Sequence, residues 1–256
     1  MKKIFLLLAL SVFAFPMIAQ NNDIAKVDSV LAKMSARARS EIKISDKTAF
    51  IKDLTEVLAD EEKFTLDDLS PYFLIDKKHC VPSDYSPKDM VLLENNALFN
   101  VNKPNMTLRR DAYISLQEMC RAALGDGVKL LVSSAYRSYS YQERLFNNYV
   151  RVDGIEAAER YSARPGTSQH QLGMAIDFGS ITDDFAETKM GRWVYNNAAR
   201  FGWTLSFPKG YEDITGYQWE CWHFRYVGIS AAEMQKKYFC DIQQYMLEFI
   251  DLWQKE

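Results

Sequence analysis

The chain has 256 residues, of which 48% are hydrophobic, 25% charged and 13% aromatic. These fractions are typical of a globular protein and exclude a mainly disordered, collagen-like or low-complexity chain. The 31 basic and 34 acidic residues give a formal net charge of −3. A chain without a basic excess is not expected to bind nucleic acid. There are three histidines, His79, His170 and His223, so any histidine-based site must draw on these.

The first twenty residues have the pattern of a secretory signal peptide. Lys2 and Lys3 precede an apolar run, and Ala19 provides a small residue for cleavage. An uncleaved membrane anchor is the alternative, but the run is shorter than the roughly 20 apolar residues of a spanning helix and Pro16 interrupts it. We therefore expect residues 1–19 to be removed on export. The mature protein is expected in the periplasm or cell envelope, without stable membrane insertion.

Four cysteines in an exported protein allow three disulfide pairings, and the sequence does not choose between them. Cys120 and Cys240 fall in predicted helices and are expected to be small core residues. Cys80 and Cys221 fall in or beside loops, where a bridge involving them stays open. The absence of a C-x-x-C pair disfavours a cysteine-rich zinc site.

The part of the chain before residue 105 is expected to be a helical and irregular extension, residues 20–104. Apolar residues such as Val27, Val30 and Met34 recur at helical spacing up to about residue 66. Several proline-containing turns follow between residues 70 and 104, which predicts an irregular segment wrapped around the next unit.

Residues 105–256 are expected to form a single domain. Helices and strands are predicted in the following order: a helix over 107–124 capped by Thr107, a strand over 128–134, a helix from Ser140 with Glu143 completing a capping box, a helix over 155–161, a strand over 174–178, a helix over 190–201, and strands over 203–207 and 222–227. Because the elements do not alternate as regular βαβ units, the pattern favours an α+β fold with a small antiparallel sheet flanked by helices. The tail over 231–253 is amphipathic and is expected to pack on the domain, with a partner or membrane face as the alternative.

Two of the histidines stand near carboxylates at spacings that suit one metal site. His170 follows a loop, and Asp177 ends a predicted strand seven residues later. Reversal of the chain near Gly173 would bring the two side chains together. Further along, Glu220 precedes His223 by three residues.

Two imidazoles and one carboxylate suffice for a catalytic zinc ion, with a fourth position left for water. The remaining carboxylate is then free to take a proton from that water. Glu220 suits this role better than Asp177, because a Glu-x-x-His turn directs the imidazole and the carboxylate to one point. The alternative is that both histidines are hydrogen-bonded core residues and that the two acids are surface charges.

Three strings of residues occur in order in the second half of the chain. They are S-A-Y-R-S-Y-x-x-Q over 134–142, S-x-H-x-x-G-x-A-x-D over 168–177 and E-x-W-H over 220–223. Together they resemble the VanY-type D-alanyl-D-alanine carboxypeptidases, a family of zinc peptidases of the bacterial cell wall. The resemblance runs from about residue 128 to residue 228 and does not extend to residues 21–100.

The resemblance implies a role for each matching residue. His170, Asp177 and His223 correspond to the ligands of one zinc ion, and Glu220 corresponds to the catalytic base. Arg137 corresponds to the arginine that holds the scissile carbonyl or the oxyanion, a role suited to a guanidinium. Two further residues correspond to groups near the substrate, Ser168 at its terminal carboxylate and Gln142 beside it. For Gln142 a place on the helix surface is the alternative.

Two positions depart from the family pattern. Cys221 replaces a common proline and is expected to point away from the metal, and Ser206 stands where a basic residue is frequent. His79 matches no ligand position and is expected to have a surface or local structural role.

The implied function is that of an exported zinc D,D-carboxypeptidase acting on peptidoglycan stem peptides. An L,D-carboxypeptidase acting on tetrapeptide stems is the alternative within the same scaffold. A non-catalytic wall-binding protein is less favoured, because a binding module does not need a base beside an open metal position.

Overall fold

The computed structural model describes residues 14–61 and 69–256. Most of the predicted leader, residues 1–19, therefore lies outside the described residues. The described part of the chain begins with a helix at Ala14. Within the described ranges, no helix combines the length and the apolarity that crossing a membrane requires.

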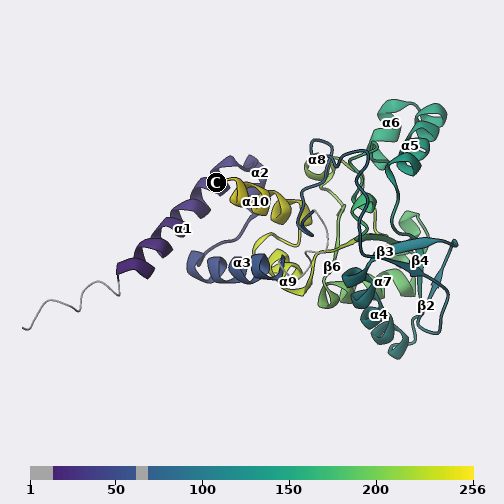
Figure 1. Ribbon diagram of the computed structural model, residues 1–256, viewed down its shortest axis with the longest axis horizontal. Helices are drawn as coiled ribbons and strands as arrows, with labels where there is room; N and C mark the ends of the chain where they lie inside the picture. The colour runs from purple at the N-terminus through teal and green to yellow at the C-terminus, as the bar shows by residue number, and fades with distance from the viewer. Residues whose placement is uncertain (1–13, 62–68) are drawn as a thin grey trace, which may run out of the picture.

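The helices gather in two groups (Figure 1). One end of the molecule holds the first three and the last two helices, α1 (Ala14–Lys33), α2 (Ala36–Glu41), α3 (Lys47–Glu61), α9 (Ile229–Tyr238) and α10 (Gln243–Lys255). The other end holds the sheet with α4 (Arg110–Gly125), α5 (Tyr139–Asp153), α6 (Ile155–Tyr161), α7 (Lys189–Asn197) and the short α8 (Glu212–Thr215). Among the described residues, 3-10 turns at η2 (Gln169–Leu172), η3 (Asp183–Glu187) and η4 (Ala198–Phe201) join these elements.

The main sheet has five strands in the order β2-β4-β5-β7-β6. Its strands are β2 (Phe99–Val101), β4 (Leu130–Ser134), β5 (Ala175–Phe178), β6 (Trp203–Leu205) and β7 (His223–Tyr226). The pairs among β4, β5, β7 and β6 are antiparallel, as expected. The edge strand β2 runs parallel to β4, which differs from the wholly antiparallel sheet that the sequence predicted. The α+β class and the flanking helices are confirmed.

The segment between residues 70 and 104 is less irregular than expected. It contains β2 and also β1 (Met90–Leu93), which pairs with β3 (Met106–Arg109) in a separate two-stranded sheet. The helix predicted to begin at Thr107 therefore starts later, at Arg110. The prediction was wrong because Thr107 and Leu108 are held by pairing with β1, a long-range contact that overrides the local capping pattern.

The helical cap before α5 is also placed differently from the prediction. Ser138 caps this helix, and its hydroxyl accepts a hydrogen bond from the Tyr141 amide. Ser140, the predicted cap, already lies in the first turn. The helix starts two residues earlier than the capping-box pattern indicated, within the usual uncertainty of helix ends.

The amphipathic tail is not one helix. Cys240 and Asp241 have φ angles of +53° and +62°, and this left-handed turn separates α9 from α10. Cys240 therefore lies in the turn and not in a helix as predicted. The apolar stripe is packed inside the protein: Met234, Tyr245 and Phe249 are fully or almost fully buried.

Two hydrophobic clusters correspond to the two groups of helices. One surrounds the sheet and includes Leu116, Val132 and Phe178. The other joins the helices of the N-terminal extension to α9 and α10, with Phe50 and Phe249 at its centre. Residues of α1 and α10 thus share one core, and the two helices lie side by side (Figure 1).

Candidate metal and catalytic site

The candidate ligands are brought together by a turn and a strand pair. His170 lies on η2, which ends at Gly173 with a φ of +68°, a left-handed conformation that glycine adopts without a Cβ clash. This reversal leads into β5, where Asp177 lies directly opposite His223 on β7. The predicted approach of His170 to Asp177 through a reversal near Gly173 is thus what the structure has.

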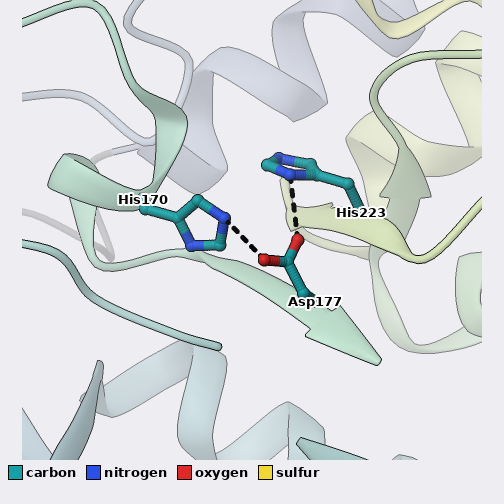
Figure 2. A group of neighbouring side chains, drawn as sticks. All are labelled: His170, Asp177 and His223. Carbon is teal, nitrogen blue, oxygen red and sulfur yellow. Dashed lines mark ion pairs between the residues drawn. The ribbon is translucent and has the colours of Figure 1, made fainter. Parts of the chain in front are cut away.

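The three side chains are buried and point toward one another (Figure 2). One Asp177 oxygen, Oδ2, lies 3.3 Å from His170 Nε2, and the other, Oδ1, lies 3.2 Å from His223 Nδ1. One ligand atom from each residue lies within 4.8 Å of the other two. This spacing suits three donors around a single ion.

A hydrogen bond on the far side of His170 fixes which ring nitrogen faces the site. Nδ1 lies 2.7 Å from the carbonyl oxygen of Ala135. A carbonyl only accepts, so Nδ1 carries the hydrogen and Nε2 keeps its lone pair. Burial and the charge of Arg137 lower the pKa of His170 to about 4, which keeps the imidazole neutral at neutral pH.

Asp177 is an ionised acid inside the protein. Burial disfavours its charge, but the guanidinium of Arg137 donates to its Oδ2 atom and favours the carboxylate, so the pKa of Asp177 is held well below the usual range. Two buried atoms at this point, His170 Nε2 and Asp177 Oδ1, form no satisfactory hydrogen bond with the described residues.

The group therefore fits a metal ion. Electron-rich atoms face one another at 3.2–3.3 Å with the ring hydrogen of His170 directed elsewhere. Buried polar groups of a folded protein are normally satisfied, and a cation between these atoms would satisfy them. Two imidazoles and one carboxylate are a donor set typical of catalytic zinc.

Glu220 lies beside this group and is also buried. Its Oε2 is 3.4 Å from His223 Nδ1. Burial and the charge of Asp177 raise the pKa of Glu220 well above its ordinary value. A carboxyl group with a raised pKa holds a proton more readily than an ordinary carboxylate, which suits a group that takes up a proton and releases it again.

Arg137 reaches the same point from the loop after β4. Its Nη2 donates to Asp177 Oδ2 at 2.8 Å, and its Nε donates to Ser134 Oγ at 3.0 Å. The side chain is partly exposed, so its positive charge is available to a group entering the site.

A cavity of about 330 Å³ opens onto these residues. Arg137, Ser168 and Glu220 line it together with the three candidate ligands, and Phe207 forms part of the wall, with its ring centroid 4.7 Å from that of His223. The structure thus brings six of the seven residues selected from the sequence to one cavity.

Gln142 is the seventh, and the structure places it behind the cavity wall. It is fully buried, so the helix-surface alternative is wrong. Its Nε2 donates to the carbonyl of Ala163 at 2.8 Å. Because Ser162 and Ala163 line the cavity, Gln142 connects α5 to the loop that forms one side of the site.

The remaining histidine and the cysteines lie apart from the metal group. His79 Nδ1 lies 2.9 Å from Asp76 Oδ1, the local structural role that was expected. Cys221 contacts the carbonyls of Thr182 and Asp183, away from the candidate ligands, also as expected. All four cysteines carry free thiols.

Sequence reasoning did not select three residues that contact the site. Ser134 supports Arg137, Phe207 packs on His223, and the Gln169 Oε1 atom lies 3.1 Å from His223 Nε2. Ser134 and Gln169 lie inside the recognised strings, but their residue types alone did not indicate a role.

Comparison with known proteins identifies relatives of the site-bearing region. A family model described as VanY, D-alanyl-D-alanine carboxypeptidase, matches residues 105–229. A D-alanyl-D-alanine carboxypeptidase of Enterococcus faecalis is 32% identical over 182 residues, which are 68% of this chain and 62% of the relative. The chain spans between 56% and 65% of the length of three curated relatives.

Two solved structures are similar in fold and sequence. The LdcB LD-carboxypeptidase matches with a TM-score of 0.60 and 30% identity, covering 73% of this chain and 97% of LdcB. A vancomycin-resistance D,D-pentapeptidase, VanY from a VanB-type cassette, was solved in complex with Zn(II). It matches with a TM-score of 0.55 and 31% identity, covering 64% of this chain and 92% of that one.

Proposed function

The chain belongs to the VanY family of D-alanyl-D-alanine carboxypeptidases, and on this premise we propose that it is an exported zinc-dependent D,D-carboxypeptidase of peptidoglycan stem peptides. The observation that carries the proposal is the buried group of His170, Asp177 and His223 with Glu220 beside it, open to one cavity. A wall-binding protein without activity has no use for such an acid next to an open metal position.

One zinc ion is assigned to His170 Nε2, Asp177 and His223 Nδ1. Bound there, zinc supplies a Lewis acid and a water whose pKa is lowered toward about 7. The neutral state of His170 and the ionised state of Asp177 are the forms that bind a cation.

Glu220 acts as the proton carrier of the reaction. It takes a proton from the attacking water and passes it to the amine of the departing D-alanine. Arg137 stabilises the negative charge that develops on the oxygen of the scissile carbonyl, because its guanidinium already lies 2.8 Å from Asp177 at the edge of the cavity.

The substrate carboxylate is assigned to Ser168, which lines the cavity next to His170. Gln142 contributes from behind, by holding the loop at Ala163.

We also propose that the chain divides into an extension, residues 20–104, and a peptidase domain, residues 105–256. The two parts are joined through the main sheet, because β2 of the extension pairs with β4.

L,D-carboxypeptidase activity on tetrapeptide stems is the second candidate. The similarity to LdcB favours it, since the chain covers nearly all of that structure. Both activities hydrolyse the last peptide bond of a stem and need the same zinc and Glu220 chemistry, so they differ only in the residue that precedes the leaving D-alanine.

The leader pattern at residues 1–19 supports export to the periplasm or cell envelope. The stem-peptide substrate is found there, outside the cytoplasmic membrane. We assign no nucleic-acid partner.

Mass spectrometry of purified muropeptides tests the proposal. The zinc-loaded protein is expected to remove one alanine from pentapeptide stems, and loss of alanine from tetrapeptide stems alone would establish the L,D alternative.

Glu220→Ala is expected to keep zinc but lose nearly all turnover, whereas His170→Ala is expected to lose zinc as well. Full activity of a verified Glu220→Ala preparation would refute the assignment of the base, and inactivity on both stems would refute the enzymatic function.

A further inference from the structure

A chain of buried side chains connects the metal group to the C-terminal helix. Gln169 on η2, Ser206 after β6 and Gln243 at the start of α10 are all buried. They link His223 to the backbone of β6 through hydrogen bonds of 2.7–3.3 Å. We propose that Gln243 is a positioning residue of the metal centre, acting through Gln169 to keep the hydrogen of His223 on Nε2. The proposal rests on the zinc ligands assigned above.

The orientation of the Gln243 side-chain amide is set by its contact with Thr204. Gln243 Nε2 lies 3.3 Å from the carbonyl oxygen of Thr204 and 2.7 Å from its hydroxyl. Because a carbonyl oxygen only accepts, the amide nitrogen of Gln243 must face Thr204. The Oε1 atom of Gln243 is thereby turned toward Gln169.

Gln169 is oriented in turn. Its Nε2 donates to Gln243 Oε1 at 3.1 Å, which directs its own Oε1 to the opposite side. Ser206 Oγ donates to this Oε1 at 2.7 Å and lies 3.2 Å from Gln243 Oε1. One acceptor, Gln243 Oε1, and one donor, Ser206 Oγ, therefore favour the same orientation of the Gln169 amide.

The orientation of the Gln169 amide determines which ring nitrogen of His223 carries the hydrogen. Gln169 Oε1 lies 3.1 Å from His223 Nε2, and as an acceptor it requires the hydrogen on that nitrogen. The other nitrogen, Nδ1, is left with its lone pair and faces Asp177 at 3.2 Å. If the Gln169 amide were reversed, Nδ1 would carry the hydrogen and could not bind a cation.

The helix that supplies Gln243 lies outside the part of the chain that matches the family model, residues 105–229. It is held in the cluster shared with α1 and α3. The helical end of the molecule therefore contributes directly to the order of the metal site.

The tautomer of His223 is measurable without zinc. With three histidines in the chain, long-range ¹H–¹⁵N spectra of ¹⁵N-histidine-labelled, zinc-free protein resolve each ring. The wild-type protein is expected to show His223 with its hydrogen on Nε2. Gln243→Met is expected to give a mixture of the two tautomers, because the Gln169 amide loses its acceptor and can reverse.

Zinc affinity provides the second measurement. Gln243→Met is expected to weaken zinc binding in a chelator competition by about tenfold to a hundredfold. Gln243→Glu keeps an acceptor for Gln169 Nε2 and is expected to retain most of the affinity. Adding Gln169→Glu to Gln243→Met is expected to restore the tautomer, since a carboxylate presents only acceptors to His223.

The matched control is Gln244→Met, the neighbouring buried glutamine on the same helix, which donates to Asp76 and Glu248 instead. It is expected to change neither the tautomer nor the zinc affinity. Thermal unfolding of the zinc-free variants separates a general loss of stability from a local effect.

A wild-type tautomer and wild-type zinc affinity in folded Gln243→Met would overturn the proposal. If Gln243→Met does not fold, Ser206→Ala, which removes only one hydroxyl, provides the test. It is expected to shift the His223 tautomer and the zinc affinity in the same direction as Gln243→Met, by a smaller amount. An unchanged tautomer and zinc affinity in Ser206→Ala would equally overturn the proposal. Failure of the wild-type protein to bind zinc would instead refute the proposed ligands, while the tautomer would still report on the amide chain.

Discussion

At the scale of single residues, the site depends on where hydrogens and charges are held. The hydrogen bond from His170 Nδ1 to the Ala135 carbonyl turns Nε2 toward Asp177, and the guanidinium of Arg137 favours the charged form of that carboxylate. Glu220, whose Oε2 lies 3.4 Å from His223 Nδ1, has its pKa shifted in the opposite direction. The pKa values of two acids in one buried site are thus shifted in opposite directions, because burial dominates at Glu220 whereas the guanidinium of Arg137 offsets it at Asp177.

Arg137 is the residue whose role is most open to kinetic measurement. Replacing it with Met removes a donor near the expected oxyanion, so kcat on the stem peptide is expected to fall by about a hundredfold to a thousandfold. Arg137→Lys keeps the charge but not the fork of two donors, and is expected to recover part of the rate. Steady-state kinetics of zinc-loaded variants measure the effect.

Arg144→Met on the exposed side of α5 serves as the control for Arg137. It is expected to leave kcat unchanged. An unchanged kcat in Arg137→Met, with zinc content verified, would contradict the assigned role.

At the scale of elements, one turn and one pair of neighbouring strands bring the site residues together. The positive φ at Gly173 reverses the chain between His170 and β5, and the β5–β7 register sets Asp177 opposite His223. The helix α5 contributes through one buried amide, that of Gln142, which holds the loop beside the cavity. An element without a catalytic residue can therefore affect the shape of the site.

Gln142→Met tests this link between helix and loop. The substitution keeps the size of the side chain but leaves the Ala163 carbonyl without its donor, and the loop that lines the cavity is expected to shift. We expect KM for the stem peptide to rise about threefold to tenfold, equivalent to roughly 1 kcal/mol, with a smaller change in kcat. The exposed Asn147→Ala on the same helix is the control, and equal KM values for both variants would contradict the link.

At the scale of the whole molecule, the two ends of the described chain stabilise one helical unit. Phe50 of α3 is fully buried and packs edge-on against Tyr238 and Phe249, with ring centroids 4.9 and 5.1 Å apart. The α9 and α10 helices extend this unit to the sheet, where α10 reaches the amides behind the metal group.

Phe50→Ala is expected to lower the free energy of unfolding by about 3–5 kcal/mol, because it removes a large buried ring and leaves a cavity. Ile229→Ala, at a half-exposed position on α9, is expected to change it by at most about 0.5 kcal/mol. Urea unfolding followed by circular dichroism measures both. Similar losses in the two variants would mean that Phe50 is not central to this core.

The agreement between sequence and structure is greatest where the signal is local. The reversal at Gly173, the short helix over 155–161 and the burial of the C-terminal stripe all follow from residue type and spacing. One error is long-range, because Thr107 resembles a helix cap but lies in a strand that pairs with β1. The others are local: Ser138 caps α5 in place of Ser140, and a left-handed turn at Cys240 interrupts a continuous apolar pattern.

The sequence by itself determined the family, the α+β class and the seven residues chosen for the site, because these depend on residue types at fixed spacing. Only the tertiary structure decided how they act together. It placed six of the seven around one cavity, moved Gln142 behind the wall, and revealed Gln169 and Gln243 behind His223. Such relations depend on hydrogen bonds between residues up to 74 positions apart, and no spacing along the chain encodes them.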